Sequence, residues 1–256
     1  MSTSPLMIGR PDESRVGVIV PSDMALDAEM WRWAPDGVSL LFTRLQDAAP
    51  PVPGAPTDVE GDEGAVWQSI FCLRSAAPAA YAHAGTSGGF VNGPEGEKRL
   101  VEAMRSAGGA EAVTTSGAML SALMHLGVSR VAVATPHDPR ITENLVTFLG
   151  EADVDVVSRS HLAITRDVWA VPYEETLQLV RDANSDQAEA VFVSGINLAT
   201  YDVIASLEAE LRKPVLTANQ VTMWALLATI DRQAVGPHQW LIHGPPVRDD
   251  DGLRTT

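Results

Sequence analysis

The sequence predicts an α/β protein with two similar lobes, each built around a parallel sheet. Short apolar stretches alternate with amphipathic stretches of about 10–15 residues, which is typical of strand–helix units that form parallel sheets. The apolar stretches, such as 131–135, do not alternate strictly with polar residues, as expected of strands that are buried on both faces. The same order of strands and helices occurs twice along the chain, and this repetition predicts two lobes.

The first set of elements begins with an apolar run from Val16 to Val20, which Pro21 ends because proline cannot donate to a strand ladder. Residues 48–56 contain too many prolines to form a helix or a central strand. The expected strands of this set are 16–20, 38–43, 79–84 and 111–114. The expected helices have apolar residues at three- and four-residue spacing and lie within 22–33, 64–75, 95–107 and 116–126.

The second set repeats this order. Its expected strands are 131–135, 154–158, 190–193 and 214–217, and its expected helices are 141–152, 173–183, 200–211 and 221–230. We therefore expect lobe one at 15–115, joined by the returning segment 221–235, and lobe two at 116–220. Residues 1–14 are expected to be a loose leader, and residues 236–256, which are rich in proline and aspartate, to be a surface-bound or loose tail.

The composition favours a cytoplasmic protein that binds a small molecule. The chain has 256 residues, 45% of them hydrophobic, and a net charge of −15, so it can form a core but would be repelled by nucleic acid and anionic membranes. No apolar run approaches the roughly 20 residues that span a bilayer, and the N-terminus lacks the pattern of a secretion signal. A single cysteine permits no internal disulfide, which agrees with a reducing compartment. A homo-oligomer is compatible with the sequence.

Two glycine-centred turns follow apolar strands in corresponding places. Residues 81–90 read YAHAGTSGGF, with Gly85 at the turn, and residues 191–198 read VFVSGINL, with Gly195 at the turn. Ligands of open α/β sheets bind beyond the carboxyl ends of the strands, so we expect the two turns to face one cleft between the lobes. Backbone N–H groups and the hydroxyls of Thr86 and Ser87 suit a carboxylate or a developing enolate oxygen. A single turn of this kind can be merely structural, but the second copy favours a ligand site.

Several further motifs accompany these turns in a fixed order. They are 15–22 (RVGVIVPS), 113–118 (VTTSGA), 131–136 (VAVATP), 197–204 (NLATYDVI) and 213–220 (KPVLTANQ), with Trp224 one helical turn later. Together they make the chain, from Arg15 to Ile230, resemble the maleate isomerase and arylmalonate decarboxylase branch of the aspartate/glutamate racemase superfamily. The resemblance implies a two-lobed fold, a site in the inter-lobe cleft and chemistry that needs no cofactor.

The chain departs from this family at the two positions where the resemblance implies reactive cysteines. Gly85 and Gly195 stand there, and neither has a side chain that could act as a nucleophile or as an acid–base group. The lone Cys72 lies in an apolar helical stretch, where we expect it to be a small core residue rather than a nucleophile.

Two histidines are the candidates for proton transfer in place of a thiol. His137 follows the Thr-Pro pair at a strand end, where the family usually has a tyrosine, and His83 lies two residues before Gly85 on the same expected strand face. His83 is alternatively a hydrogen-bonded core residue. The other histidines, His125, His161, His238 and His243, show no paired spacing, and we expect His161 on the surface and no bound metal.

The resemblance also indicates which residues contact substrate. Ser22 and Asp23 fall in the substrate loop, although Asp23 could instead repel a carboxylate or cap the helix that follows, and we favour the cap. Beside Gly195 and Ile196, Asn197 corresponds to a polar ligand contact, or else caps a helix. The remaining positions are Tyr201, a ligand-site residue or a lobe-packing aromatic, and Asn219 and Gln220, which we expect to tie the lobes together.

These observations favour a cofactor-independent lyase or isomerase that acts on a small carboxylate or β-keto-type acid. The turn at 85–87 would stabilise an enolate, and His137 or His83 would protonate it. Two alternatives remain open, namely a relative that binds a small acid without turnover and an enzyme of another reaction class in secondary metabolism.

Overall fold

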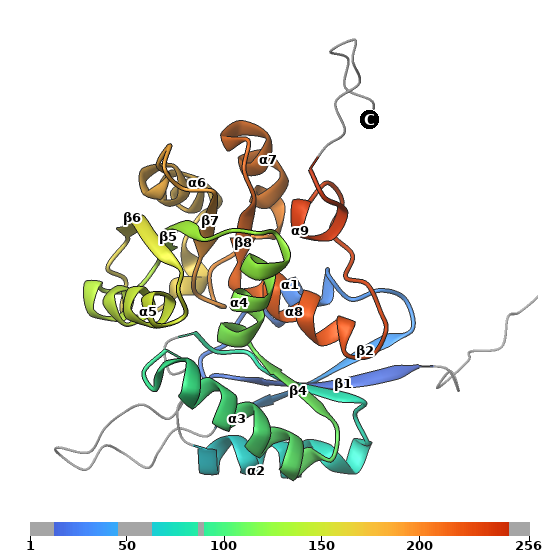
Figure 1. Cartoon of the computed structure of the whole chain (residues 1–256). Helices are drawn as coiled ribbons and strands as arrows, with labels where there is room; N and C mark the ends of the chain where they lie inside the picture. The colour runs from blue at the N-terminus through green and yellow to red at the C-terminus, as the bar shows by residue number, and fades with distance from the viewer. Residues whose placement is uncertain (1–12, 46–62, 87–89, 246–256) are drawn as a thin grey trace, which may run out of the picture.

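The computed structural model describes residues 13–45, 63–86 and 90–245, and it contains two four-stranded parallel sheets (Figure 1). The first sheet has the order β2-β1-β3-β4, and the second has the corresponding order β6-β5-β7-β8. Their strands are β1 Ser14–Val20, β2 Val38–Arg44, β3 Ala80–His83, β4 Glu111–Thr114, β5 Arg130–Thr135, β6 Asp155–His161, β7 Ala190–Val193 and β8 Val215–Thr217. The predicted fold class, two similar parallel-sheet α/β lobes, is confirmed.

Helices connect the strands and cover the sheets (Figure 1). They are α1 Asp27–Trp31, α2 Glu63–Leu73, α3 Gly93–Gly108, α4 Thr115–His125, α5 Pro139–Glu151, α6 Tyr173–Ala183, α7 Tyr201–Leu211, α8 Ala218–Ala228 and α9 Trp240–His243. The local sequence explains where two of these helices begin. At α5 the side chain of Asp138 accepts hydrogen bonds from two backbone N–H groups of the first turn. At α8, Thr217 and Gln220 form a reciprocal capping box.

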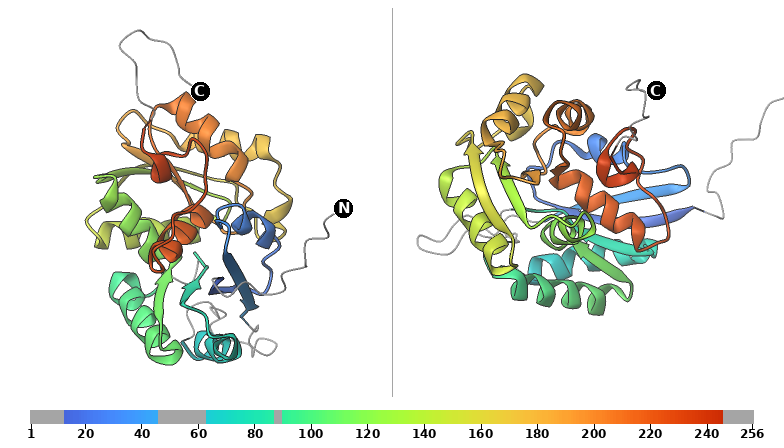
Figure 2. Two further views of the ribbon diagram at one scale, coloured as in Figure 1. Left: turned by 90° about the vertical axis from the view of Figure 1, so that its right-hand side faces the viewer. Right: turned by 45° about the horizontal axis from the view of Figure 1, so that its top comes forward.

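The helix that follows the last strand of each sheet packs against the other sheet. Helix α4 follows β4, yet Met119 and Leu123 pack in one core cluster with Val131 of β5. Helix α8 follows β8, and its residues Met223 and Leu227 pack in the cluster that contains β1. Figure 1 and Figure 2 both show α4 and α8 side by side between the two sheets. Separating the lobes would therefore expose both cores to water, at a cost of about 25 cal/mol for each Å² of apolar surface.

A pair of buried hydroxyls joins these two helices. The Oγ1 atoms of Thr115 and Thr222 lie 2.7 Å apart, and Thr222 Oγ1 also donates to the carbonyl of Ala218 at 2.7 Å. Both hydroxyl groups are thus satisfied away from water, as buried polar groups need to be.

The expectation that Cys72 is a core residue is wrong, because its side chain is exposed on α2. The helix buries Val66, Ile70 and Leu73, as the spacing predicts. Its apolar residues continue around the helix, however, and Trp67 and Phe71 stack on the outer face with ring centroids 5.8 Å apart. An apolar helical stretch therefore does not by itself place a residue in the core.

The expectation of a loose tail from Gly236 is wrong for residues 236–245. Gln239 is buried, and its Oε1 accepts hydrogen bonds from Trp33 Nε1 and Gln220 Nε2, both at 2.9 Å. Helix α9 adds Leu241 and Ile242 to the core. Residues 1–12 and 246–256 and the proline-rich stretch 48–56 lie outside the described residues. Among the helices described, none is long and apolar enough to cross a membrane.

Glu208 links three elements from a fully buried position. Its Oε1 accepts from the Val215 backbone N–H at 3.1 Å, and its Oε2 accepts from that of Trp240 at 3.0 Å. Burial raises the pKa of Glu208 to about 8, although the two hydrogen bonds act in the opposite direction. The folded protein therefore holds a proton here that the unfolded chain releases near its ordinary pKa of 4.5.

This difference predicts a pH-dependent contribution to stability. The contribution of Glu208 is fully present below pH 4.5 and is lost as pH rises through about 8, because the unfolded chain loses the proton first. Thermal unfolding at a series of pH values should therefore show a shallower loss of Tm with rising pH for Glu208→Gln than for the unmodified protein. Glu210→Gln, which removes an exposed ion-pair partner of Arg181, is the matched control. Equal slopes for the Glu208 variant and the unmodified protein would contradict this assignment.

Candidate active site at the carboxyl ends of the strands

The candidate residues lie just beyond the carboxyl ends of the central strands. In the first sheet, Ile19 of β1 is in register with His83 of β3, which is in register with Thr114 of β4. In the second sheet, Ala134 is in register with Val193, and Val193 with Thr217. The segments that follow these strand ends carry the predicted site residues of both lobes.

The residues that flank the two glycine turns share one core cluster. Ala84, next to Gly85, and Ile196, next to Gly195, pack in the same buried cluster as Val20 and Ala218. Ile196 follows a strand of the second sheet but contributes to the core beside the first. The turn after β3 and the turn after β7 are thus brought together by apolar packing.

Gly195 brings the backbone of its turn into close contact with the end of β5. Its φ angle is +98°, which side-chain-bearing residues rarely adopt. A Cβ atom at this position would lie 2.8 Å from Pro136 Cγ and 3.6 Å from Nε2 of His137. The imidazole of the half-buried His137 therefore lies within van der Waals contact of the place where a side chain at position 195 would begin.

His83 is fully buried as the last residue of β3. Its neighbour Tyr81, two residues earlier, belongs to the cluster formed by α2 and α3, whereas Ala82 and Ala84 belong to the cluster that contains α8 residues. Alternation along a strand puts His83 on the same side as Tyr81. This placement agrees with the core interpretation of His83, and its role in proton transfer stays a prediction.

The loop after β1 is held by Asn197 rather than by a helix cap. Asn197 Oδ1 accepts from the Ala25 N–H at 2.9 Å, and its Nδ2 donates to the Asp23 carbonyl at 3.0 Å. Helix α1 begins after Leu26 with no side-chain cap. The expectation that Asp23 caps this helix is therefore wrong, and so is the alternative that Asn197 caps its own. Asp23 and Ser22 are both exposed.

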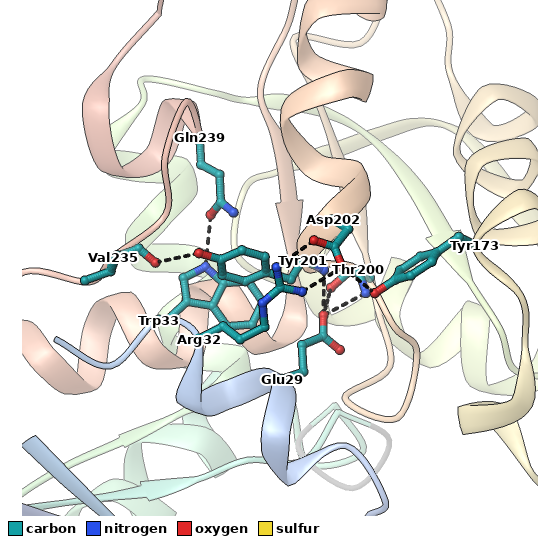
Figure 3. A network of polar contacts seen from close by, with 9 residues as sticks. All are labelled: Glu29, Arg32, Trp33, Tyr173, Thr200, Tyr201, Asp202, Val235 and Gln239. Atoms are coloured by element: carbon teal, nitrogen blue, oxygen red, sulfur yellow. Dashed lines mark hydrogen bonds and ion pairs between the residues drawn. The ribbon is translucent and has the colours of Figure 1, made fainter. Parts of the chain in front are cut away.

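Tyr201 packs between the lobes, as its alternative interpretation predicts. Its ring centroid lies 4.7 Å from that of Trp33, and the guanidinium carbon of Arg32 lies 3.8 Å from the ring centroid (Figure 3). The Tyr201 hydroxyl also donates to the Val235 carbonyl at 3.4 Å. Nothing in this arrangement directs the Tyr201 hydroxyl to the glycine turns.

The remaining predicted residues fall into three groups. Thr86 is buried beside Gly85, whereas Ser87 lies outside the described residues. Asn219 donates through Nδ2 to the Ile196 carbonyl at 2.9 Å and so supports the second turn. Gln220 donates through Nε2 to Gln239 Oε1, and the same oxygen accepts from Nε1 of Trp33 in lobe one.

Sequence reasoning missed two acidic residues near the strand ends. Glu97 of α3 accepts a hydrogen bond from Thr114 Oγ1 at 2.8 Å, and burial raises the pKa of Glu97. Its carboxylate fills the space beside Gly117, where a Cβ atom would collide with it. Glu29 of α1 contacts the start of α7. Both contacts join distant parts of the chain, so no local pattern reveals them. Across 13–45, 63–86 and 90–245, no group of three or more His, Cys, Asp or Glu side chains is arranged to hold a metal ion.

Two four-stranded parallel sheets of corresponding strand order, with the turns after β3 and β7 packed near one core cluster, match the racemase-like class of α/β proteins. Within that class, the model of the arylmalonate decarboxylase family matches residues 63–239. The chain belongs to the arylmalonate decarboxylase family.

Individual relatives agree with this membership. Arylmalonate decarboxylase of Bordetella bronchiseptica is 32% identical over 158 residues, which is 59% of this chain and 65% of the relative. Maleate isomerase of Pseudomonas putida is 28% identical over 148 residues, which is 56% of this chain and 59% of the relative. The chain thus aligns with less than two thirds of the length of these two proteins. The structure of unliganded arylmalonate decarboxylase superposes with a TM-score of 0.77 and 26% identity, covering 90% of this chain and 98% of that one.

The geometry at Gly195 predicts that even an alanine is poorly tolerated there. Gly195→Ala should lower the free energy of unfolding by about 1–3 kcal/mol, because the φ angle is strained for alanine and the new Cβ meets Pro136. Gly150→Ala in α5 is the matched control, since a Cβ there meets nothing within 4 Å and helical Gly→Ala changes stabilise by about 0.5–1 kcal/mol. Chemical denaturation measures both values, and a Gly195→Ala protein as stable as the unmodified one would contradict the close approach.

Proposed function

We propose that this protein is a cofactor-independent lyase that decarboxylates a small malonate-type acid through an enolate, with His137 as the proton donor. Family membership supports the reaction class, because the named relatives are a decarboxylase and an isomerase. The observation that carries the proposal is the position of His137 Nε2, 3.6 Å from the place of a Cβ on Gly195. In this proposal Gly85 and Gly195 replace the reactive cysteines of the resembling enzymes, and the imidazole replaces the thiol.

The proposed reaction has two steps. The bond between the α-carbon and one carboxylate breaks, CO₂ leaves, and the electron pair forms an enolate on the remaining acid. The Nε2–H of the His137 imidazolium then gives its proton to the α-carbon, and the imidazole regains a proton from water. Imidazole is suited to this transfer because the same ring can both give and take a proton.

Enolate stabilisation is proposed for the turn after β3. The Thr86 side chain is buried beside Gly85, and its hydroxyl would be a donor where negative charge develops. Removing one such donor typically costs about 10²–10³ in rate. A β-keto acid, or a small acid that is isomerised through the same enolate, would use the same two groups.

One observation favours binding without turnover as the second candidate. The chain has one cysteine, Cys72, which is exposed on α2, so neither glycine turn carries a thiol. A protein that holds a small acid at the Thr86 turn but has no effective proton donor would keep the same fold. Measured ligand binding without CO₂ release would support this candidate against the enzyme.

Replacing His137 tests the enzyme directly. With phenylmalonate as the probe, His137→Ala should reduce the rate of CO₂ release by about 10²-fold or more, while His137→Gln should spare Kd more than kcat. His161→Ala is the control, because His161 is exposed at the end of an edge strand. Reactions in D₂O should place one deuterium on the α-carbon of the product. Full activity of His137→Ala on phenylmalonate would show that another group donates the proton.

A further inference from the structure

Glu29 caps a helix that belongs to the other lobe. Its Oε1 accepts three hydrogen bonds, from Thr200 N at 2.7 Å, Thr200 Oγ1 at 2.9 Å and Tyr201 N at 2.6 Å (Figure 3). Thr200 is the N-cap residue of α7 but makes no capping bond with its own side chain. The N–H groups at the start of a helix need an acceptor, and a residue far away in the sequence supplies it.

The Glu29 carboxyl group is buried and only half satisfied. Glu29 is 7% exposed, and its Oε2 has no hydrogen-bond partner among the described residues. Burial raises the pKa of Glu29, while the three hydrogen bonds and Arg32 act in the opposite direction. A buried carboxylate with one free oxygen is costly unless it holds a proton. A neutral carboxyl still offers Oε1 as the acceptor for α7.

The charged and titratable groups around Glu29 are occupied with one another. Arg32, one turn along α1, forms a two-pronged ion pair with Asp202 at 2.7 and 2.6 Å. Asp202 also accepts from the Tyr173 hydroxyl at 2.9 Å, and burial, with this bond, raises the pKa of Tyr173 to about 12. Tyr201 lies under the Arg32 guanidinium (Figure 3). The Arg32 guanidinium and the hydroxyls of Tyr173 and Tyr201 therefore bond to partners other than Glu29 Oε2.

The capped helix continues directly from the candidate site. Gly195 and Asn197 precede Thr200 by a few residues, and Asn197 bonds the loop that leads into α1. The hydrogen bonds of Asn197 and those of Glu29 thus join the same two segments, the one from β1 into α1 and the one from β7 into α7. A shift of α7 relative to α1 would carry the Gly195 turn away from its place beside His137.

We propose that Glu29 is a positioning residue: by holding the N-terminus of α7 to α1, it fixes the Gly195–Asn197 turn against His137. The part of this proposal that concerns turnover rests on the proposed function, whereas the part that concerns the turn does not. Small displacements of reacting groups matter, because a misplacement of about 1 Å can cost about 10² in rate.

Two substitutions in the full-length protein separate the roles of Glu29. Glu29→Gln keeps the acceptor and puts an amide nitrogen where Oε2 has no partner, so it should behave like the unmodified protein. Glu29→Ala removes the acceptor, and hydrogen exchange at the amides of Thr200 and Tyr201 should accelerate by about tenfold or more. Exchange in the distant helix α3 should stay unchanged. Glu175→Gln, at an exposed position on α6, is the control.

The kinetic readout uses phenylmalonate. Glu29→Ala should lower kcat by about tenfold or more with a smaller change in KM, and Glu29→Gln should restore it. The proposal is overturned if Glu29→Ala folds with unchanged exchange at residues 195–201, or if Glu29→Gln is as impaired as Glu29→Ala. If exchange changes as expected but the unmodified protein never decarboxylates phenylmalonate, the positioning of the turn is supported and the proposed function fails instead.

Discussion

The contact between the Gly195 turn and the end of β5 constrains the rest of the candidate site. At this contact the backbone takes a φ angle of +98°, and a Cβ would come within 2.8 Å of Pro136. The space that a side chain at 195 would need lies beside His137 Nε2. The imidazole of His137 is therefore a titratable side chain next to the Gly195 turn at this end of the second sheet.

The first lobe holds this turn from the opposite side. The buried bonds made by Asn197 and Glu29 matter more here than the ion pair of Arg32 with Asp202, whose side chains are 42% and 49% exposed. Exposed pairs contribute about 0–1 kcal/mol, whereas a buried donor left without its acceptor costs about 1–3 kcal/mol. Helices α4 and α8 each pack against the sheet of the other lobe, so residues of both lobes contribute to each of two core clusters. The candidate site thus lies at an interface between the lobes. Apolar packing holds this interface together, and the hydrogen bonds of Asn197 and Glu29 fix the position of the Gly195 turn within it.

Most of the fold could be predicted from the sequence because strands buried on both faces and amphipathic helices leave local patterns. His137 could be found in the same way, since it follows a strand end. Glu29 could not, because its hydrogen bonds join residues about 170 positions apart, and no local pattern records such a contact. The apolar pattern does not place Cys72 correctly, because α2 is apolar on its outer face as well. The local sequence does not reveal the packing of 236–245, because Gln239 is buried through hydrogen bonds with Trp33 and Gln220, which lie in other parts of the chain.

The most direct test of the account is whether one small acid contacts both His137 and the Gly195 turn. Protein labelled with ¹⁵N can be titrated with phenylacetate, the acid that decarboxylation of phenylmalonate would give, while the imidazole and backbone resonances are followed by NMR. The account predicts saturable shifts of His137 Nε2 and of the Gly195 amide with one common Kd, and no shift at the exposed His161. Saturable binding of phenylacetate that leaves both His137 and Gly195 unshifted would contradict it.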